Sequence, residues 1–264
     1  FLDFGDLTYA QYAAATYCTG IYAGSAGGSP DGGGTSIKTI NRFVTKTLGN
    51  AADFGDLNTD TYYTTGHSTS TRGYKFGGTD QPSPGITNVI ESWIAASTGG
   101  ATDFGDLHTG VTSPSACGSS TRGLNGGGDT PTTLNVIDYI TLATEGNATD
   151  FGDLSVARDG LGSASSSTRG LWTGGATPSK SDVIDYVTIA STGNATDFGD
   201  LISGVKGSGV RGASSPTVGA FIDTGNAIHT VTIASTGDAT DFADLTGTTS
   251  DRFMINSNAH GGIS

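Results

Sequence analysis

Short apolar segments, rich in β-branched and aromatic residues, recur along the chain between glycine-rich turns. In residues 183–189, apolar side chains occupy both alternating sets of positions, with Ile184 on one set and Val187 on the other. The segment is too short between its turns to favour a helix, so we predict a strand. A strand that is apolar on both faces is buried on both, which in an antiparallel protein requires whole sheets to stack face to face. No helical periodicity competes elsewhere, and the chain is expected to be all-β.

A second pattern is a long-range repeat. The sequence Ala-Thr-Asp-Phe-Gly-Asp-Leu at 101–107 recurs, with small variations, so that the chain contains six copies. The first aspartates of the copies are Asp3, Asp53, Asp103, Asp150, Asp197 and Asp241. Successive copies are therefore 50, 50, 47, 47 and 44 residues apart, a period typical of propellers and solenoids. Because the repeat covers residues 1–264, we predict one domain, with repeats beginning near residues 1, 51, 101, 148, 195 and 239.

Each repeat contains four short segments that suit antiparallel strands, one of them the motif itself. In a regular strand Phe104 and Leu107 would lie on opposite faces, whereas a bulge at Gly105 would turn them to the same side. Gly-Asn, Gly-Gly and Gly-Asp pairs just before the motif suit tight hairpins with positive φ. No repeat can bury both of its faces alone. We therefore predict a β-propeller of six four-stranded blades.

The two ends of the chain bear on how such a ring would close. The sequence opens on the motif at residues 1–7 and stops after residues 252–262, which resemble the glycine-doublet strand of a repeat. We predict that these two ends meet in a mixed sixth blade. The alternative is that the chain is a fragment of a longer protein, or a processed one, since Phe1 is not an initiator methionine and no signal peptide follows it.

The repeats resemble kelch repeats. The resemblance rests on a period near 50, a Gly-Gly doublet and an aromatic residue in the strand after it. The doublets are Gly77-Gly78, Gly127-Gly128 and Gly174-Gly175, and the aromatic residues are Trp93, Tyr139 and Tyr186. The fifth repeat, residues 211–222, lacks the doublet, and the calcium loop of integrin-like propellers is absent. The resemblance implies a kelch-like β-propeller. The repeat sequences are also similar to those in phage virion proteins, chiefly tail and fibre components.

Composition narrows the classes of partner. Twelve lysines and arginines against 25 acidic residues give a formal net charge of −13, which repels nucleic acid phosphates. No apolar run approaches 18 residues, so we expect no membrane insertion. Cys18 and Cys117 lie at similar offsets in repeats one and three, so a disulfide between them is not expected.

The motif aspartates and a set of arginines recur with the repeat. The aspartates are Asp3, Asp6, Asp53, Asp56, Asp103, Asp106, Asp150, Asp153, Asp197, Asp200, Asp241 and Asp244, and the arginines are Arg72, Arg122, Arg169 and Arg211. We predict a structural role, in which Asp–Arg and Asp–backbone pairs fix the turns of each blade and join it to its neighbour. A fold built from six repeats needs such a contact in every repeat, whereas a ligand site rarely needs six copies. The alternative is a set of carboxylate sites for calcium.

No catalytic constellation stands out. Asp-Phe-Gly occurs without the other protein-kinase motifs, and there is no Gly-x-Ser-x-Gly nucleophile elbow. The four histidines, His67, His108, His229 and His260, lack metal-ligand spacing. The copper ligands of galactose oxidase, a kelch-propeller enzyme, cannot be placed on this sequence. We predict no catalytic, cofactor-binding or metal residues and no cofactor.

Tyrosine-rich departures from the repeat suggest recognition loops. The candidates are Tyr9, Tyr12, Tyr17, Tyr22, Tyr62, Tyr63 and His67, beside glycine-rich residues 24–34 and the loop 80–85. Aromatic residues with small polar neighbours on loops suit binding of sugars or proteins, while the alternative is that these tyrosines pack between blades.

The sequence therefore predicts a non-enzymatic structural or recognition protein. We expect it on a virion, as a tail or fibre component, or outside the cell, with a receptor, a glycan or other particle proteins as partner and homo-oligomerisation left open. The alternatives are a secreted carbohydrate-active propeller enzyme and an intracellular adaptor scaffold.

Overall fold

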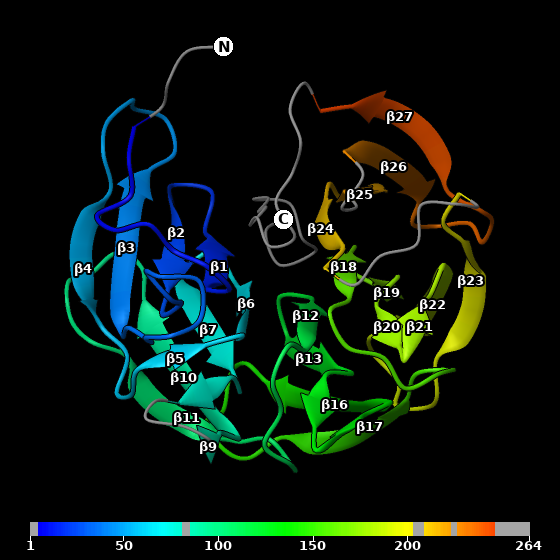
Figure 1. The fold of residues 1–264 in the computed structure, drawn as a ribbon, viewed down its shortest axis with the longest axis horizontal. Helices are drawn as coiled ribbons and strands as arrows, with labels where there is room; N and C mark the ends of the chain where they lie inside the picture. The colour runs from blue at the N-terminus through cyan, green and yellow to red at the C-terminus, as the bar shows by residue number, and fades with distance from the viewer. Residues whose placement is uncertain (1–4, 81–84, 203–208, 223–225, 246–264) are drawn as a thin grey trace.

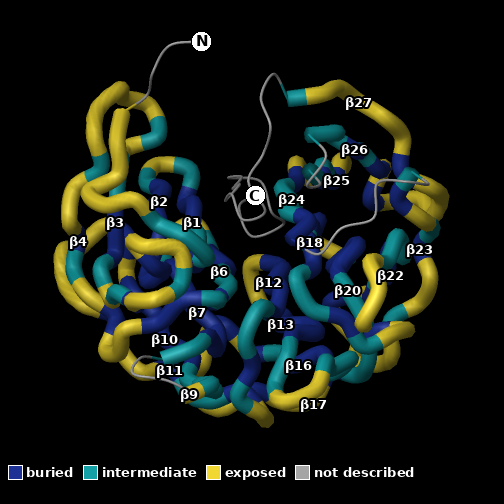
Figure 2. Tube along the Cα trace, viewed as in Figure 1, coloured by how far each residue is buried: buried dark blue, intermediate teal, exposed yellow. Residues whose placement is uncertain are grey.

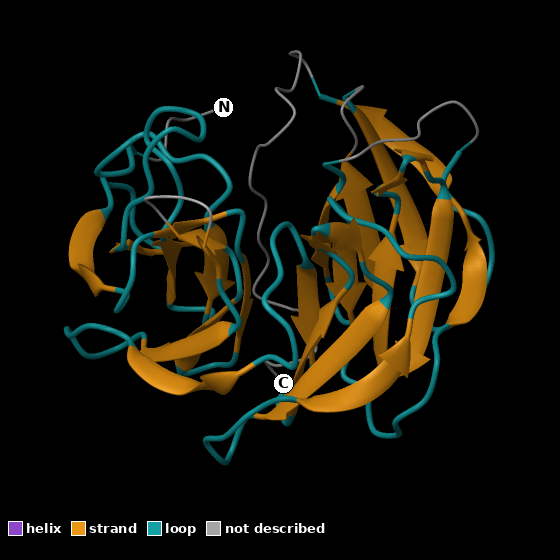
Figure 3. Cartoon of the chain, turned by 60° about the horizontal axis from the view of Figure 1, so that its bottom comes forward, coloured by secondary structure: helices purple, strands orange, loops and turns teal. Residues whose placement is uncertain are grey.

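The computed structural model describes residues 5–80, 85–202, 209–222 and 226–245, and these residues form strands and loops only (Figure 3). The prediction of an all-β protein is confirmed for this part of the chain. It also holds no helix that could cross a membrane.

Five four-stranded antiparallel sheets dominate the structure, and we number them blades 1 to 5 in chain order. Blade 1 contains β1 (Ala15–Cys18), β2 (Tyr22–Ala26), β3 (Thr39–Val44) and β4 (Ala52–Asp56). Blade 2 contains β6 (Thr65–Ser68), β7 (Arg72–Phe76), β10 (Val89–Ile94) and β11 (Thr102–Asp106). Blade 3 contains β12 (Ser115–Gly118), β13 (Arg122–Gly126), β16 (Val136–Thr141) and β17 (Thr149–Asp153). Blade 4 contains β18 (Gly162–Ser165), β19 (Arg169–Thr173), β22 (Val183–Thr188) and β23 (Thr196–Asp200). Blade 5 contains β24 (Arg211–Ser214), β25 (Val218–Ile222), β26 (Ala227–Thr232) and β27 (Thr240–Asp244).

Short strands lie in the loops between second and third strands, and one more precedes the first strand of blade 2. A three-stranded sheet joins β5 (Thr61–Tyr62), β8 (Thr79–Asp80) and β9 (Gly85–Ile86). Two small hairpins pair β14 (Asp129–Thr130) with β15 (Thr132–Thr133) and β20 (Ala176–Thr177) with β21 (Ser179–Lys180).

The blades follow one another in an arc around a common centre (Figure 1). The first strands, β1, β6, β12, β18 and β24, lie innermost, and those of neighbouring blades contact each other. The last strands, β4, β11, β17, β23 and β27, lie at the rim (Figure 1). Blades 1 and 5 stand at the two ends of the arc. The arrangement is consistent with a β-propeller. The expected sixth blade falls largely on residues 1–4 and 246–264, which lie outside the described residues.

The hydrophobic core lies between blades rather than within them. Four clusters of buried side chains each combine residues of two consecutive blades; one unites Leu124 and Phe151 of blade 3 with Leu161 and Val187 of blade 4. Buried positions gather on the inner strands, and exposed ones at the rim (Figure 2). Ile184 and Val187, on opposite faces of β22, are both buried, as the sequence pattern predicts.

The motif strand is bulged. Ile90 of β10 pairs with Gly105, and Glu91 pairs with Asp103, so that Phe104 is the additional residue on β11. The same register shift occurs in all five blades. Of the two alternatives open from the sequence, the structure contains the bulge, which lets both Phe104 and Leu107 be buried.

Candidate functional site

The repeated motif lies on the outermost strand of each blade and joins that blade to the next. In blade 3, the carbonyl of Asp153 accepts a hydrogen bond from the backbone N–H of Ala195 in blade 4, at 2.7 Å. The carbonyl of Phe151 accepts another from Gly193, also at 2.7 Å. We call this set of contacts the clasp. The Ala-to-Asp bond recurs at Ala51–Asp6, Ala101–Asp56, Ala148–Asp106 and Ala239–Asp200.

Glycine is required in the clasp because two backbones approach closely. Gly152 has φ of 143°, and a Cβ atom there would lie 2.5 Å from the carbonyl carbon and oxygen of Gly193. Side chains rarely adopt such a φ, so both requirements exclude other residues. The sixth motif copy has Ala243 at the equivalent position. Its neighbour Phe242 is 70% exposed, whereas Phe151 in the clasp is 2% exposed.

The two aspartates of the motif make different hydrogen bonds, the first through its carboxylate and the second through its backbone N–H. The first aspartate accepts a hydrogen bond from the glycine two residues later, at 3.0 Å for Asp103, 3.1 Å for Asp150 and 3.2 Å for Asp197. The second aspartate donates its N–H to a side-chain oxygen in the next blade's turn. These pairs are Asp6–Asn50, Asp106–Asn147, Asp153–Asn194 and Asp200–Asp238, at 3.0–3.1 Å.

The repeated arginines also bridge blades, but toward carbonyl oxygens. Arg122 donates to the carbonyl of Ile189 at 2.9 Å and stacks over the ring of Tyr139. Arg169 donates to the carbonyl of Ile233 at 3.0 Å and stacks over Tyr186. The sequence led us to expect aspartate partners for these arginines. The structure instead gives both of them a carbonyl and an aromatic ring.

Sequence reasoning missed a polar position in the middle of each third strand. It is occupied by Asn41, Glu91, Asp138, Asp185 and His229. In three blades its carboxylate accepts the backbone N–H of the residue that follows the preceding motif. The donors are Asn58 at 2.6 Å, His108 at 3.1 Å and Ser155 at 3.2 Å. The sequence did contain a sign of this position, because a polar residue is the third residue of each of these strands.

Two of these carboxylates form fully buried ion pairs. Glu91 lies 3.3 Å from Lys75 of the neighbouring strand, and Asp185 lies 2.6 Å from Arg158. Arg158 also donates to the carbonyls of Gly174 and Val183. Burial lowers the pKa of Lys75, while the nearby Glu91 opposes that shift. Such pairs specify geometry because a partner left alone would be a buried charge.

In blade 3 the partner of the buried carboxylate reaches solvent. Asp138 lies 3.0 Å from Nδ1 of His108, whose side chain is 56% exposed. Burial raises the pKa of Asp138, and the contacts with His108 partly offset that increase. The pair joins a buried carboxyl to an exposed imidazole ring.

Three of the predicted recognition residues meet between blades 1 and 2. The rings of Tyr12 and Tyr63 lie edge to face at 5.8 Å, with their hydroxyl oxygens 3.4 Å apart. Tyr62 packs on Tyr63 at 4.5 Å. We call these three residues the tyrosine cluster. The glycine-rich loop reaches it near Gly33, and Asp31 shapes that loop by accepting hydrogen bonds from both neighbouring backbone and hydroxyl groups.

The other predicted recognition residues are placed elsewhere. Tyr9 is 56% exposed on a loop, and Tyr22 lies under the guanidinium of Arg42. Tyr17 is fully buried against Trp93. His67 is also buried, with Nε2 3.2 Å from the carbonyl oxygen of Ser119 in blade 3. The loop 80–85 lies mostly outside the described residues.

Within the described ranges, no three histidine, cysteine or acidic side chains gather as a metal site would require. Comparison of the sequence with protein-family models and with curated proteins finds no match.

Proposed function

We propose that this chain is a non-enzymatic recognition propeller, kelch-like in its repeat, displayed on a virus particle or outside the cell. Its partner would be a receptor, a glycan or another protein of the particle. We treat the contacts that recur in every repeat as the scaffold, and the residues that depart from the repeat as the functional surface. The same fold can carry many different binding sites, so function must be argued from the residues of the site.

The observation that carries the proposal is the backbone of Tyr63. This residue has φ of 52°, a left-handed conformation. The equivalent positions in blades 1, 3 and 4 are Ala13, Ser113 and Gly160, all small residues with φ of 54°, 54° and 63°. Holding a bulky aromatic residue in this conformation costs about 1–3 kcal/mol. Stability alone would favour glycine there, so the tyrosine is better explained by what its ring contacts.

The surroundings of Tyr63 also suit recognition. Its ring and that of Tyr12 are half-buried, so each combines an ordered aromatic face with accessible surface and a hydroxyl group. Aromatic rings of this kind supply large contact areas at a small cost in side-chain entropy.

The proposal includes a sixth blade made from both ends of the chain. Two observations support it. Asp6 accepts from Ala51 as the rim strand of a preceding blade would, and Phe242 on β27 is exposed where the other motif phenylalanines are covered. A mixed blade placed between blades 5 and 1 would use both features and would close the ring of blades.

Binding of the labelled protein to intact cells, and to a glycan array, tests the proposed function. We expect saturable binding that Tyr63→Ser weakens at least tenfold without lowering the melting temperature. Ser113→Ala, at the equivalent position of blade 3, is the matched control and should bind normally. Treating the cells with protease or periodate separates protein from glycan receptors. Absence of saturable binding, together with turnover of a carbohydrate substrate, would overturn the proposal.

A further inference from the structure

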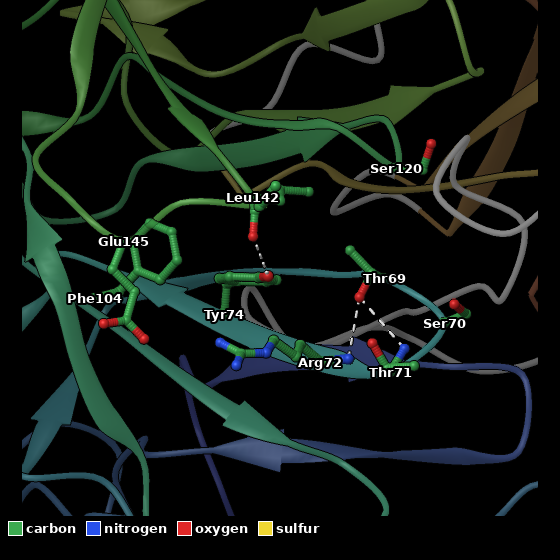
Figure 4. Close-up of a pocket in the computed structure, with 10 residues that line it drawn as sticks. Thr69, Ser70, Thr71, Arg72, Tyr74, Phe104, Ser120, Leu142 and Glu145 are labelled. Atoms are coloured by element: carbon green, nitrogen blue, oxygen red, sulfur yellow. Dashed lines mark hydrogen bonds between the residues drawn. The ribbon is translucent and has the colours of Figure 1, made fainter.

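A cleft of about 600 Å³ opens between blades 2 and 3 (Figure 4). Its walls come from the turn that joins β6 to β7, the turn that joins β12 to β13, and the turn that joins β16 to β17. Side chains that line it include Thr69, Arg72, Tyr74, Ser120 and Glu145. None of the residues that line it belongs to the tyrosine cluster.

The cleft exists because this joint departs from the others. In blades 3 and 4, an arginine of the second strand stacks on a tyrosine of the third strand and donates to the next blade, as in the pairs Arg122–Tyr139 and Arg169–Tyr186. In blade 1 the two residue types exchange strands. Arg42 of β3 stacks over Tyr22 of β2 and still donates to the carbonyl of Ala95 in blade 2, at 3.0 Å.

In blade 2, the aromatic partner of the arginine is replaced, and the carbonyl partner is bound by another residue. The third-strand position holds Ser92 in place of tyrosine. Tyr74 of β7 packs on Phe104 instead, at 5.5 Å and edge to face. Its hydroxyl donates to the carbonyl of Leu142 at 3.4 Å, which is the acceptor that an arginine uses at the other joints.

Arg72 is left without these contacts. Its guanidinium makes no hydrogen bond, ion pair or ring-stacking contact with any residue that the structure describes. The side chain is half-buried and lines the cleft beside Tyr74 (Figure 4). A guanidinium presents five N–H donors in a planar fork, so it is a strong binding group that has no side-chain partner in the described part of the chain.

The opposite side of the cleft departs from the repeat as well. Glu145 stands in the β16–β17 turn, where the corresponding turns carry Leu48, Thr98, Thr192 and Thr236. Its exposed carboxylate is not within ion-pair distance of Arg72 or of any other described cation. One joint therefore combines a donor group and an acceptor group, each without a partner among the described residues, and several hydroxyl groups around one hollow.

We infer that this cleft binds a neutral sugar residue of a glycan, an inference that rests on the proposed recognition function. An anion would meet Glu145 and a molecule of net charge −13, and a cation would meet Arg72. An apolar ligand would leave both charged groups unpaired. Adjacent sugar hydroxyls accept from the guanidinium and donate to the carboxylate, which matches both groups at once.

Ligand-observed NMR with free sugars tests the inference. The probes are glucose, galactose, mannose and N-acetylglucosamine, with glucuronate and galacturonate as charged counterparts. We expect at least one neutral sugar to bind, and Glu145→Thr and Arg72→Gln each to weaken that binding about tenfold. Glu145 is exposed and Arg72 is half-buried, and Glu145→Thr installs the residue that blades 4 and 5 carry.

A second variant closes the cleft without removing Arg72. The double substitution Tyr74→Leu, Ser92→Tyr gives blade 2 the leucine and tyrosine of blades 3 and 4. The introduced tyrosine would stack under Arg72, and we expect sugar binding to be lost at an unchanged or higher melting temperature. Binding of acidic sugars alone, or neutral-sugar binding that survives all three variants, would overturn the inference.

The outcome also separates this inference from the proposed function. If the cleft variants still bind neutral sugars and Tyr63→Ser no longer binds cells, the recognition function stands and the cleft inference is wrong. If the wild-type chain binds no cell and no arrayed glycan, the proposed function fails whatever the cleft variants do.

Discussion

Gly152→Ala tests the clasp between blades 3 and 4. The new methyl group would lie 2.5 Å from the carbonyl of Gly193, and φ of 143° is unfavourable for alanine. The strained backbone costs about 1–3 kcal/mol. The two backbones must also separate, which breaks three hydrogen bonds: Ala195 to Asp153, Gly193 to Phe151, and Asp153 to Asn194.

Each of these bonds contributes about 1 kcal/mol to stability. Together with the strain, the substitution should lower the free energy of unfolding by about 4–6 kcal/mol. That is a large part of the 5–15 kcal/mol that ordinary domains possess. The protein should still fold at room temperature, but its urea midpoint should fall sharply.

Urea unfolding followed by tryptophan fluorescence measures this effect. Trp172 is fully buried and donates from Nε1 to the carbonyl of Ser115 at 2.9 Å, so it reports on the joint that the substitution strains. Trp93 is the other tryptophan of the chain and reports on the joint between blades 1 and 2. In the variant we expect an earlier transition for Trp172, and a lower m-value if the two joints no longer unfold together.

Ala243→Gly is the matched control, because the sixth motif copy carries alanine where the other five copies carry glycine, so it makes the reverse exchange at the equivalent position. It should change stability by no more than about 1 kcal/mol, the usual cost of glycine in a strand. The reasoning is refuted if Gly152→Ala costs less than about 1 kcal/mol, or if the two substitutions cost the same.

Three further predictions concern buried groups. Arg158→Met should cost about 3–5 kcal/mol in urea unfolding because it leaves Asp185 as an unpaired buried charge; adding Asp185→Asn should recover part of that loss, and no recovery would contradict the role of charge. Burial raises the pKa of Asp138 above its unfolded value, so the stability due to its protonated form is present below about pH 4 and is lost as the pH rises through the folded pKa. The stability of Asp138→Asn relative to the wild type should therefore improve with rising pH across that window, and a worsening would refute the assigned direction. Burial also raises the pKa of the Cys117 thiol, so a thiol reagent should modify it at neutral pH only after denaturation; rapid reaction in the native protein would show that the joint opens readily.

The sequence predicted the strands, and offered the bulge as one of two alternatives, because both depend on local features. Apolar runs between glycine turns identify strands, and Gly105 marks the place where the motif strand needs an unusual backbone. The partner of Arg122 could not be predicted in the same way. It depends on how far one blade rotates against the next, and that rotation places the carbonyl of Ile189 under the guanidinium.

The cleft shows a similar limit. Ser92 and Glu145 are visible in the sequence as departures from the repeat, but they lie 53 residues apart in different blades. Only the packing of blade 2 against blade 3 places Arg72, which Ser92 leaves without a stacking partner, and Glu145 around the same cleft. The tyrosine cluster was easier to predict, because unusual tyrosines occur at neighbouring positions of consecutive repeats.

The clasp has a direction along the chain, and this affects how the protein is made. In every clasp the acceptor strand precedes its donor by 39 to 45 residues, from Asp200–Ala239 to Asp6–Ala51. During synthesis, the clasp hydrogen bonds of a blade can therefore form as soon as the next repeat has emerged from the ribosome. Such contacts are short in sequence and should form quickly, one repeat behind the growing end. In the proposed six-bladed ring, only the mixed blade requires segments from the two ends to meet, so we expect ring closure to be the slow and final step of folding.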